Sequence, residues 1–166
     1  PPHAYLSDIL LIKGSVCRKL GKLDESEELL MASLRMKEQL YDPPHHEIAY
    51  NLNHLSSLMQ EKGLYDEALP YAIQSLEQRL QVLGQDHLET TASMSNLARI
   101  YRRTGKDSLA LDLYNQVHEK FSRLYPEGHP YINMTMHNQA SCYIGMDQLD
   151  IAEAISRKVF NSDLVL

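Results

Sequence analysis

Positive charge is in short supply in this chain. Its 166 residues include 16 Lys and Arg against 22 Asp and Glu, which gives a formal net charge of -6. Because neutralising phosphates needs a cationic surplus, this balance excludes a general nucleic-acid binder. No apolar run approaches the roughly 18 residues of a membrane-spanning helix, and no signal-peptide pattern opens the chain. We therefore expect neither a nucleic-acid partner nor membrane insertion.

Motifs of catalysis and metal binding are also missing. The sequence has no nucleophile elbow, no phosphate-cradling glycine loop and no His-Glu-x-x-His. His45 and His46 form the only adjacent histidine pair, and no third ligand stands at helical spacing from them. The sequence predicts a protein that is not an enzyme and that holds no metal or cofactor.

What the chain does have is a repeat: residues of similar type recur at an interval of 42 residues. Such repetition is the signature of a repeat architecture. The residues in phase are His3, His45, His87 and His129; Gly21, Gly63 and Gly105, with Asp147 at the fourth place; and Ser26, Ala68, Ala110 and Ala152. We predict repeats at 3–44, 45–86, 87–128 and 129–163, forming a single repeat domain over 1–166. The chain starts within a connecting loop and ends just past a helix, so we expect a fragment of a longer protein.

Each repeat is predicted to be a pair of helices. In the second copy, apolar residues recur at helical spacing between Glu47 and Lys62, and Gly63 follows where the left-handed conformation closes a helix. Asp66 then offers an N-cap for a second helix, and Asp24 has the spacing of a capping box with Glu27. Small residues recur in both helices, at Gly14, Ser56, Ala98 and Ala140 and at Ser26, Ala68, Ala110 and Ala152. These two columns should mark where the helices of a pair approach most closely.

Stacking of the pairs fixes what the cysteines and histidines can do. Cys17 and Cys142 would lie three repeat steps apart, whereas a disulfide needs Cα atoms within about 7 Å. We therefore expect reduced thiols and a cytoplasmic location. Each in-phase histidine precedes the first helix of its repeat, so capping or packing against the previous turn is expected there. Metal binding is not, because repeated positions diverge along a stacked array.

The small-residue columns, with a Gly-x-Tyr/Leu-Asp-Glu-Ala-like turn between them, resemble the tetratricopeptide repeat. The usual repeat has about 34 residues, so these longer units are similar to those of kinesin light chains. The matching segments are HHEIAYNLNHLSSLMQEKGLYDEALPYAIQSLEQRLQVLGQD (45–86), HLETTASMSNLARIYRRTGKDSLALDLY (87–114) and HPYINMTMHNQASCYIGMDQLDIAEA (129–154). The resemblance implies an all-α fold, a right-handed superhelical solenoid of four helix hairpins with eight helices.

The same resemblance implies where a partner would bind. In tetratricopeptide proteins the first helix of each pair lines a concave groove that holds a peptide. Asparagine amides suit a peptide backbone, and guanidinium groups suit carboxylates. We therefore expect a protein or peptide partner that is acidic or has a free carboxylate. The candidate residues are Arg18, Lys19, Asn53, His54, Asn96, Arg99, Arg102, Arg103, His137 and Asn138.

Other readings of these residues stay open. The asparagines can instead join neighbouring helices through hydrogen bonds, and arginines near a helix end can be solvated residues favoured by the helix dipole.

The leading functional hypothesis is a protein–protein interaction scaffold, either a cargo adaptor of motor proteins or a substrate receptor of a ubiquitin ligase. The alternative is a structural spacer or an oligomerisation module for flanking domains, with self-association through the terminal repeats. A structural role predicts apolar patches on the terminal repeats, whereas peptide binding predicts a salt-sensitive affinity.

Overall fold

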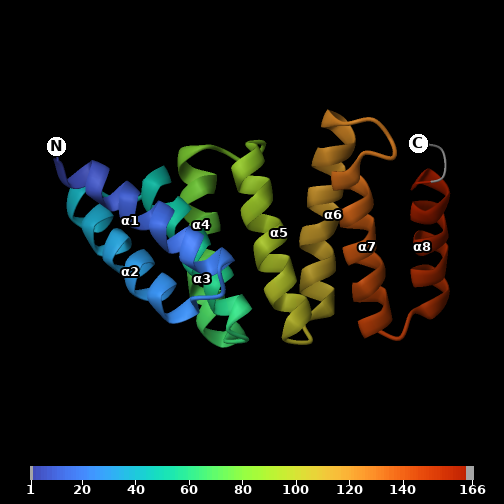
Figure 1. The fold of residues 1–166 in the computed structure, drawn as a ribbon. Helices are drawn as coiled ribbons and strands as arrows, with labels where there is room; N and C mark the ends of the chain where they lie inside the picture. The colour runs from blue at the N-terminus through green and yellow to red at the C-terminus, as the bar shows by residue number, and fades with distance from the viewer. Residues whose placement is uncertain (1, 164–166) are drawn as a thin grey trace. The chain divides into compact units, whose positions relative to one another are not determined.

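The computed structural model describes residues 2–163, and the regular secondary structure of that range is all helical (Figure 1). The eight helices between residues 2 and 163 are α1 (Pro2–Lys19), α2 (Leu23–Leu40), α3 (His46–Glu61), α4 (Tyr65–Val82), α5 (Leu88–Arg103), α6 (Asp107–Leu124), α7 (Pro130–Gly145) and α8 (Leu149–Asp163). Each predicted repeat therefore contributes two helices, and the all-α helix-hairpin fold is confirmed.

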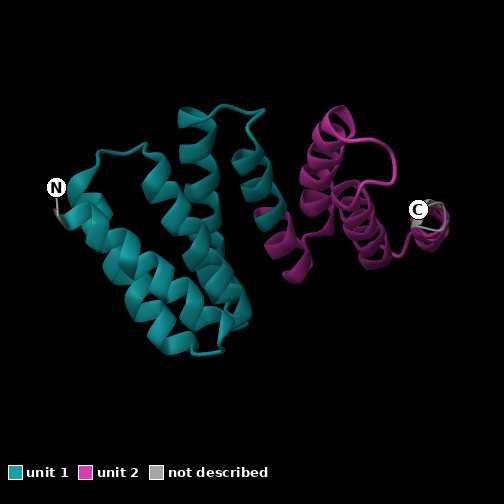
Figure 2. Ribbon diagram, turned by 45° about the horizontal axis from the view of Figure 1, so that its top comes forward, with its two compact units in different colours: residues 1–96 teal, residues 97–166 magenta. Residues whose placement is uncertain are grey.

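The chain forms two compact units, residues 1–96 and 97–166, and the division falls within α5 (Figure 2). Unit 1 has a core built mainly on α1 to α4, with Leu30, Leu52 and Leu55 among its buried members. Unit 2 has a core around Ala98, Tyr114 and further residues of α5 to α7. The two units are described separately below, and the single domain over 1–166 stays a prediction.

The small-residue columns lie where the helices of a pair meet. All eight positions are buried. In unit 1 the Ser26 hydroxyl donates to the carbonyl of Gly14 at 2.8 Å, and a Cβ on Gly14 would stand 2.9 Å from Cγ of Leu30. A larger side chain in either column would separate the paired helices, so this prediction is confirmed.

The first helices end as predicted, but the second helices begin differently. Gly63 has φ +77°, and the amide of Leu64 donates to the Met59 carbonyl at 2.9 Å, which closes α3. Asp147 takes the same left-handed conformation without being a glycine, with φ 60°. The left-handed prediction for the turn position is confirmed.

The predicted acidic N-caps are wrong. The N-caps of α2 and α4 are Lys22 and Leu64, and neither makes a side-chain capping bond. The left-handed turn is so tight that each helix starts two residues after its glycine, which places Asp24 and Asp66 inside the first turn. There a negative charge still interacts favourably with the helix dipole.

The in-phase histidines are capping residues. Nδ1 of His45, His87 and His129 accepts from the backbone N–H two residues later, at 3.2, 3.2 and 3.3 Å. His45 also stacks on Tyr41, and His129 on Tyr125, with ring centroids 4.0 Å apart in each pair. The capping prediction is confirmed for these three, whereas His3 lies inside α1.

Buried cations join successive repeats of unit 1. Lys37 on α2 is fully buried and pairs with Asp8 at 3.0 Å and with Glu47. One repeat later, Arg79 on α4 is 2% exposed and pairs with Glu89 at 3.3 Å. Its Nη1 also donates to the Glu89 carbonyl at 2.8 Å and to the Ser93 hydroxyl at 2.9 Å.

The corresponding joint in unit 2 is aromatic. The positions of Arg79 and Glu89 are taken 42 residues later by Phe121 and Tyr131. Their rings stack with centroids 5.3 Å apart. In unit 1, Arg79 donates to the carbonyl of Glu89. In unit 2, the equivalent carbonyl is that of Tyr131, and it accepts a hydrogen bond from the Thr135 hydroxyl at 2.7 Å. The same two positions of the repeat thus form an ion pair in unit 1 and an aromatic stack in unit 2.

Candidate peptide-binding surface

The ten residues predicted to bind a peptide lie on first helices of both units. Unit 1 holds Arg18 and Lys19 on α1, Asn53 and His54 on α3, and Asn96 on α5. Unit 2 holds Arg99, Arg102 and Arg103 on α5, and His137 and Asn138 on α7.

In unit 1 the first helices are joined by side-chain hydrogen bonds. Asn96 is buried, and its Nδ2 donates to Oδ1 of Asn53 at 3.1 Å and to the Ser56 hydroxyl at 3.2 Å. Its Oδ1 accepts from Nε2 of Gln60 at 2.7 Å. Asn96 therefore uses its amide to join α5 to α3, which supports the structural alternative for this residue.

Asn53 keeps part of its amide unused. Its Oδ1 accepts from Asn96, while its Nδ2 donates no hydrogen bond to any residue that the structure describes. The side chain is half-buried. Because an amide nitrogen carries two donors, Asn53 can still donate to a backbone carbonyl of a partner.

Arg18 and Lys19 are adjacent but differ in their ion pairing. The Arg18 guanidinium pairs with Glu61, which joins α1 to α3. Lys19 is exposed and forms no ion pair with the part of the chain that is described. The positive charge expected from Arg18 is therefore largely neutralised within the protein.

His54 lies at the centre of the unit 1 surface. Its Nδ1 is 3.0 Å from the Ser15 hydroxyl, and its ring meets that of Tyr50 with centroids 4.7 Å apart. Burial, and then the charges of Arg18, Arg79 and Lys37, lower the pKa of His54 to about 4. The histidine is neutral at pH 7, and the three cations act on the same part of the surface.

Tyr50 is a further surface residue of α3, beside the ten candidates. It is exposed, and the Arg79 guanidinium carbon lies 5.9 Å from its ring centroid. A tyrosine at the first-helix position next to His54 is a usable sequence signal, because exposed aromatic rings are enriched at protein interfaces.

In unit 2 the three arginines have different surroundings. Arg99 and Arg103 are exposed and stand four residues apart, which places them on one side of α5. Arg102 is half-buried and, with Arg99, acts on Tyr114, whose pKa burial nonetheless raises to about 12. Arg102 therefore belongs to the packing of unit 2 more than to its surface.

The α7 residues complete the unit 2 group. His137 is exposed and Asn138 is half-buried. The neighbouring Gln139 donates from Nε2 to Oδ1 of Asn115 at 2.8 Å. That bond ties α7 to α6, so the polar residues of this helix also divide between packing and surface.

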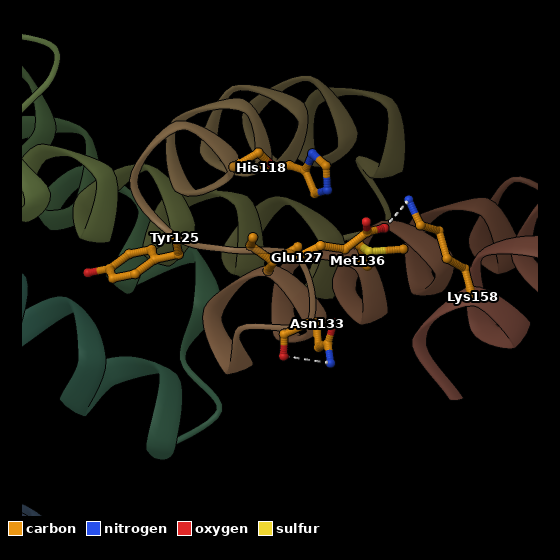
Figure 3. A pocket seen from close by; sticks show the side chains of 9 residues that line it. His118, Tyr125, Glu127, Asn133, Met136 and Lys158 are labelled. Atoms are coloured by element: carbon orange, nitrogen blue, oxygen red, sulfur yellow. Dashed lines mark hydrogen bonds and ion pairs between the residues drawn. The ribbon is translucent and has the colours of Figure 1, made fainter. Parts of the chain in front are cut away.

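Unit 2 also contains a pocket of about 210 Å³ between α6, α7 and α8 (Figure 3). Glu127 and Lys158 form an ion pair at 3.2 Å across it, and Nδ2 of Asn133 donates to the Gly128 carbonyl at 3.4 Å. His118 stands here at the position that Leu34 and Leu76 fill as buried side chains in the earlier repeats. The pocket thus lies where the earlier repeats have a buried leucine. We attribute the pocket to incomplete packing around His118.

Other kinds of site are not found in the described residues. Between residues 2 and 163, no three or more His, Cys, Asp and Glu side chains are grouped so that they could hold a metal. None of the helices in that range is long and apolar enough to cross a membrane. Cys17 and Cys142 are both buried and unpaired.

The comparisons with known proteins agree with this helix-hairpin architecture. The family model for the tetratricopeptide repeat matches residues 5–69 and 47–123. The chain belongs to the tetratricopeptide repeat family. Members of this family are generally non-enzymatic scaffolds whose fold mediates protein–protein interaction. No curated protein matches the chain.

Three solved tetratricopeptide structures show how widely this fold extends. A point variant of nearly identical TPR-like repeats, ascribed to a kinesin light chain of Podosopora anserina, is 21% identical with a TM-score of 0.85, over 96% of this chain and 74% of that one. BtubC (BKLC) from P. vanneervenii is 15% identical with a TM-score of 0.87, over 96% and 64%. The TPR2AB domain of yeast Sti1 in complex with pHSP90 is 14% identical with a TM-score of 0.55, over 98% and 79%. The fold is therefore that of kinesin-light-chain-like tetratricopeptide proteins.

Proposed function

We propose that the first helices of this chain bind a partner peptide that is acidic or ends in a free carboxylate. The observation that carries this proposal is the unit 1 surface around His54, where Tyr50 is exposed beside the histidine and Asn53 retains donors. A ring to stack on and an amide to hold a backbone are the groups that such a ligand needs.

The charges favour an acidic ligand. On unit 1 the exposed Lys19 has no ion pair within the described residues and carries positive charge on a first helix, although the chain as a whole is acidic. The other cations near His54, namely Arg18, Arg79 and Lys37, are each paired with a carboxylate. On unit 2, the exposed Arg99 and Arg103 add positive charge to a first helix. Positive potential attracts carboxylates and raises their rate of encounter.

The neighbouring structures support the choice of a peptide. The Sti1 domain was solved as a complex with pHSP90. The kinesin-light-chain-like neighbours favour a cargo adaptor, and a substrate receptor of a ubiquitin ligase would present the same surface. The two free thiols favour a cytoplasmic location for either role.

The test is peptide binding by wild type and by Arg99→Glu/Arg103→Glu, measured by fluorescence anisotropy. The probes are acidic and neutral peptides with free or amidated C-termini. Because an exposed charge pair contributes about 0.2–1 kcal/mol, we expect roughly a tenfold loss of affinity for acidic peptides. Wild-type affinity should also fall as salt rises from about 50 to 300 mM.

A matched control carries the same change of charge on second helices. Arg35 on α2 and Arg123 on α6 are exposed, so Arg35→Glu/Arg123→Glu should bind acidic peptides like wild type. Asn53→Ala tests the unit 1 surface and should weaken binding without unfolding. If the α5 variant and the control bind alike, or if no peptide binds, the chain serves instead as a spacer or oligomerisation module.

A further inference from the structure

Among the four first helices that the structure describes, only α3 ends in an acidic residue. The last residues of α1, α3, α5 and α7 hold the same place in the 42-residue register, and they are Lys19, Glu61, Arg103 and Gly145. The C-terminus of a helix favours a cation and disfavours a carboxylate, because the helix dipole is negative there. Glu61 is therefore not stabilised by its own helix, and its charge is compensated by another element.

The partner of Glu61 is Arg18. The Arg18 guanidinium donates from Nη1 to Oε1 of Glu61, which links the end of α1 to the end of α3. The next residue, Lys62, does not compensate Glu61. Its ammonium group is bound instead to Asp24 at 2.7 Å and to Glu27 at 2.6 Å. Within the described part of the chain, Glu61 therefore depends on Arg18 alone.

The Arg18–Glu61 pair is more accessible than the other ion pairs near His54. Lys37 is fully buried and is held by two carboxylates. Arg79 is also buried, and it donates to a carbonyl and a hydroxyl besides its ion pair. The Arg18 guanidinium makes no second hydrogen bond to a described residue, and the Glu61 side chain is 46% exposed. A carboxylate from outside can therefore reach this pair and take the place of Glu61.

Arg18 lies within the unit 1 surface on which peptide binding is proposed. Ser15 and Arg18 are three residues apart, so they lie on the same face of α1. The Ser15 hydroxyl is 3.0 Å from Nδ1 of His54, and the charge of Arg18 contributes to the lowered pKa of that histidine. A ligand that contacts His54 therefore comes close to the guanidinium.

We propose that Glu61 occupies Arg18 in place of a ligand carboxylate, and that an acidic peptide binds unit 1 by displacing it. This displacement rests on the peptide binding proposed above and adds to it the residue that sets the charge selectivity of unit 1. A neutral peptide leaves the pair intact and gains nothing from the arginine. A peptide carboxylate replaces Glu61, whose exposed side chain returns to water, and forms a charge-assisted bond with the guanidinium. Glu61 therefore weakens the binding of acidic peptides by the strength of the pair it forms.

Fluorescence anisotropy with two matched peptides tests the displacement. One labelled peptide carries two glutamates, and the other carries glutamines at the same places. Because an exposed ion pair is weak, Glu61→Gln should tighten binding of the glutamate peptide about two- to fivefold and leave the glutamine peptide unchanged. The control Glu119→Gln removes the same charge from an exposed pair with Arg123 on α6, and it should bind both peptides like wild type. Equal affinities of Glu61→Gln and wild type for the glutamate peptide overturn the proposal.

A double-mutant cycle separates displacement from simple charge repulsion. Arg18→Gln should weaken binding of the glutamate peptide, and adding Glu61→Gln should then give no gain, because no guanidinium is left to release. If the gain persists in Arg18→Gln/Glu61→Gln, Glu61 acts by repulsion alone and displacement is wrong. Circular dichroism verifies that each variant keeps its helices. Arg18→Met, which keeps the aliphatic stem, replaces Arg18→Gln if the latter loses its helical signal.

The outcomes also separate displacement from the proposed function as a whole. The glutamate peptide can bind wild type, lose affinity in Arg99→Glu/Arg103→Glu and remain insensitive to Glu61→Gln. The ligand then depends on unit 2, and only the displacement at unit 1 is wrong. If neither wild type nor any variant binds either peptide, the proposed function is wrong and the displacement is wrong with it.

Discussion

The joint between the second and third repeats can be converted to the chemistry of the next joint. We consider first Arg79→Phe, which installs the residue found 42 positions later at Phe121. The substitution removes the bonds from Nη1 to the Glu89 carbonyl at 2.8 Å and to the Ser93 hydroxyl at 2.9 Å. Each hydrogen bond from a charged group contributes about 1.5–3 kcal/mol.

The net effect follows from two opposing quantities. Losing both bonds costs roughly 3–6 kcal/mol, and the buried aromatic ring returns about 2 kcal/mol. We therefore expect the apparent free energy of unfolding to fall by roughly 3 kcal/mol. Glu89 adds little to the loss, because its side chain is 46% exposed and regains water.

Two more substitutions should recover most of that stability. Glu89→Tyr supplies the ring that stacks on Phe121 in the next joint, where an aromatic pair adds about 0.5–1.5 kcal/mol beyond its buried area. Ser93→Thr installs the residue found at Thr135, whose hydroxyl donates to the carbonyl of Tyr131 in the preceding turn. The triple variant should come within about 1 kcal/mol of wild type.

The assay is urea denaturation followed by circular dichroism, with hydrogen exchange of α4 and α5 to localise the loss. Because stacked repeats need not unfold in one step, the exchange data decide whether the change is confined to this joint. If the triple variant is as unstable as Arg79→Phe alone, the two joints are not interchangeable and the reasoning fails.

Two smaller predictions concern pH and backbone strain. Burial and neighbouring cations lower the pKa of His54 to about 4. Between pH 4 and 6.5 the folded state therefore holds fewer protons than the unfolded state. Stability should therefore be complete above pH 6.5 and fall by roughly 3 kcal/mol as the pH drops to 4, and His54→Gln should flatten this profile in denaturation curves. Asp147 holds φ 60°, so Asp147→Gly should raise stability by about 1 kcal/mol, measured as a higher melting temperature, while Gly105→Ala at φ 73° should lower it. A melting temperature that falls in Asp147→Gly would contradict the strain argument.

The repeat pattern could be predicted because it consists of local signals. A glycine that closes a helix and a small residue that lets two helices touch each act over a few residues, and their recurrence at 42 residues makes them unmistakable. The acidic N-caps were wrong for an equally local reason. The left-handed turn places each cap two residues earlier, at Lys22 and Leu64, and sequence preferences do not resolve such a shift.

The candidate site was predicted only in part, because exposure and pairing depend on the neighbouring repeat. The sequence placed Arg18, Asn96 and Arg99 alike on first helices. The structure pairs Arg18 with Glu61, buries Asn96 between two helices and leaves Arg99 exposed. The buried cations Lys37 and Arg79 were not foreseen, because charged residues are seldom fully buried unless a partner from another element pairs with them.

The sequence by itself determined the register: where each helix pair lies, which columns are small, and which family the chain belongs to. These features follow from short-range periodicity, which a single chain displays completely. Only the tertiary structure decided which polar groups are already satisfied and which surfaces are left uncovered. Asn96 and Asn138 hold the same place in the 42-residue register, yet Asn96 is buried and Asn138 is half-buried. Their difference arises because burial is a property of the contact between repeats, not of either residue alone.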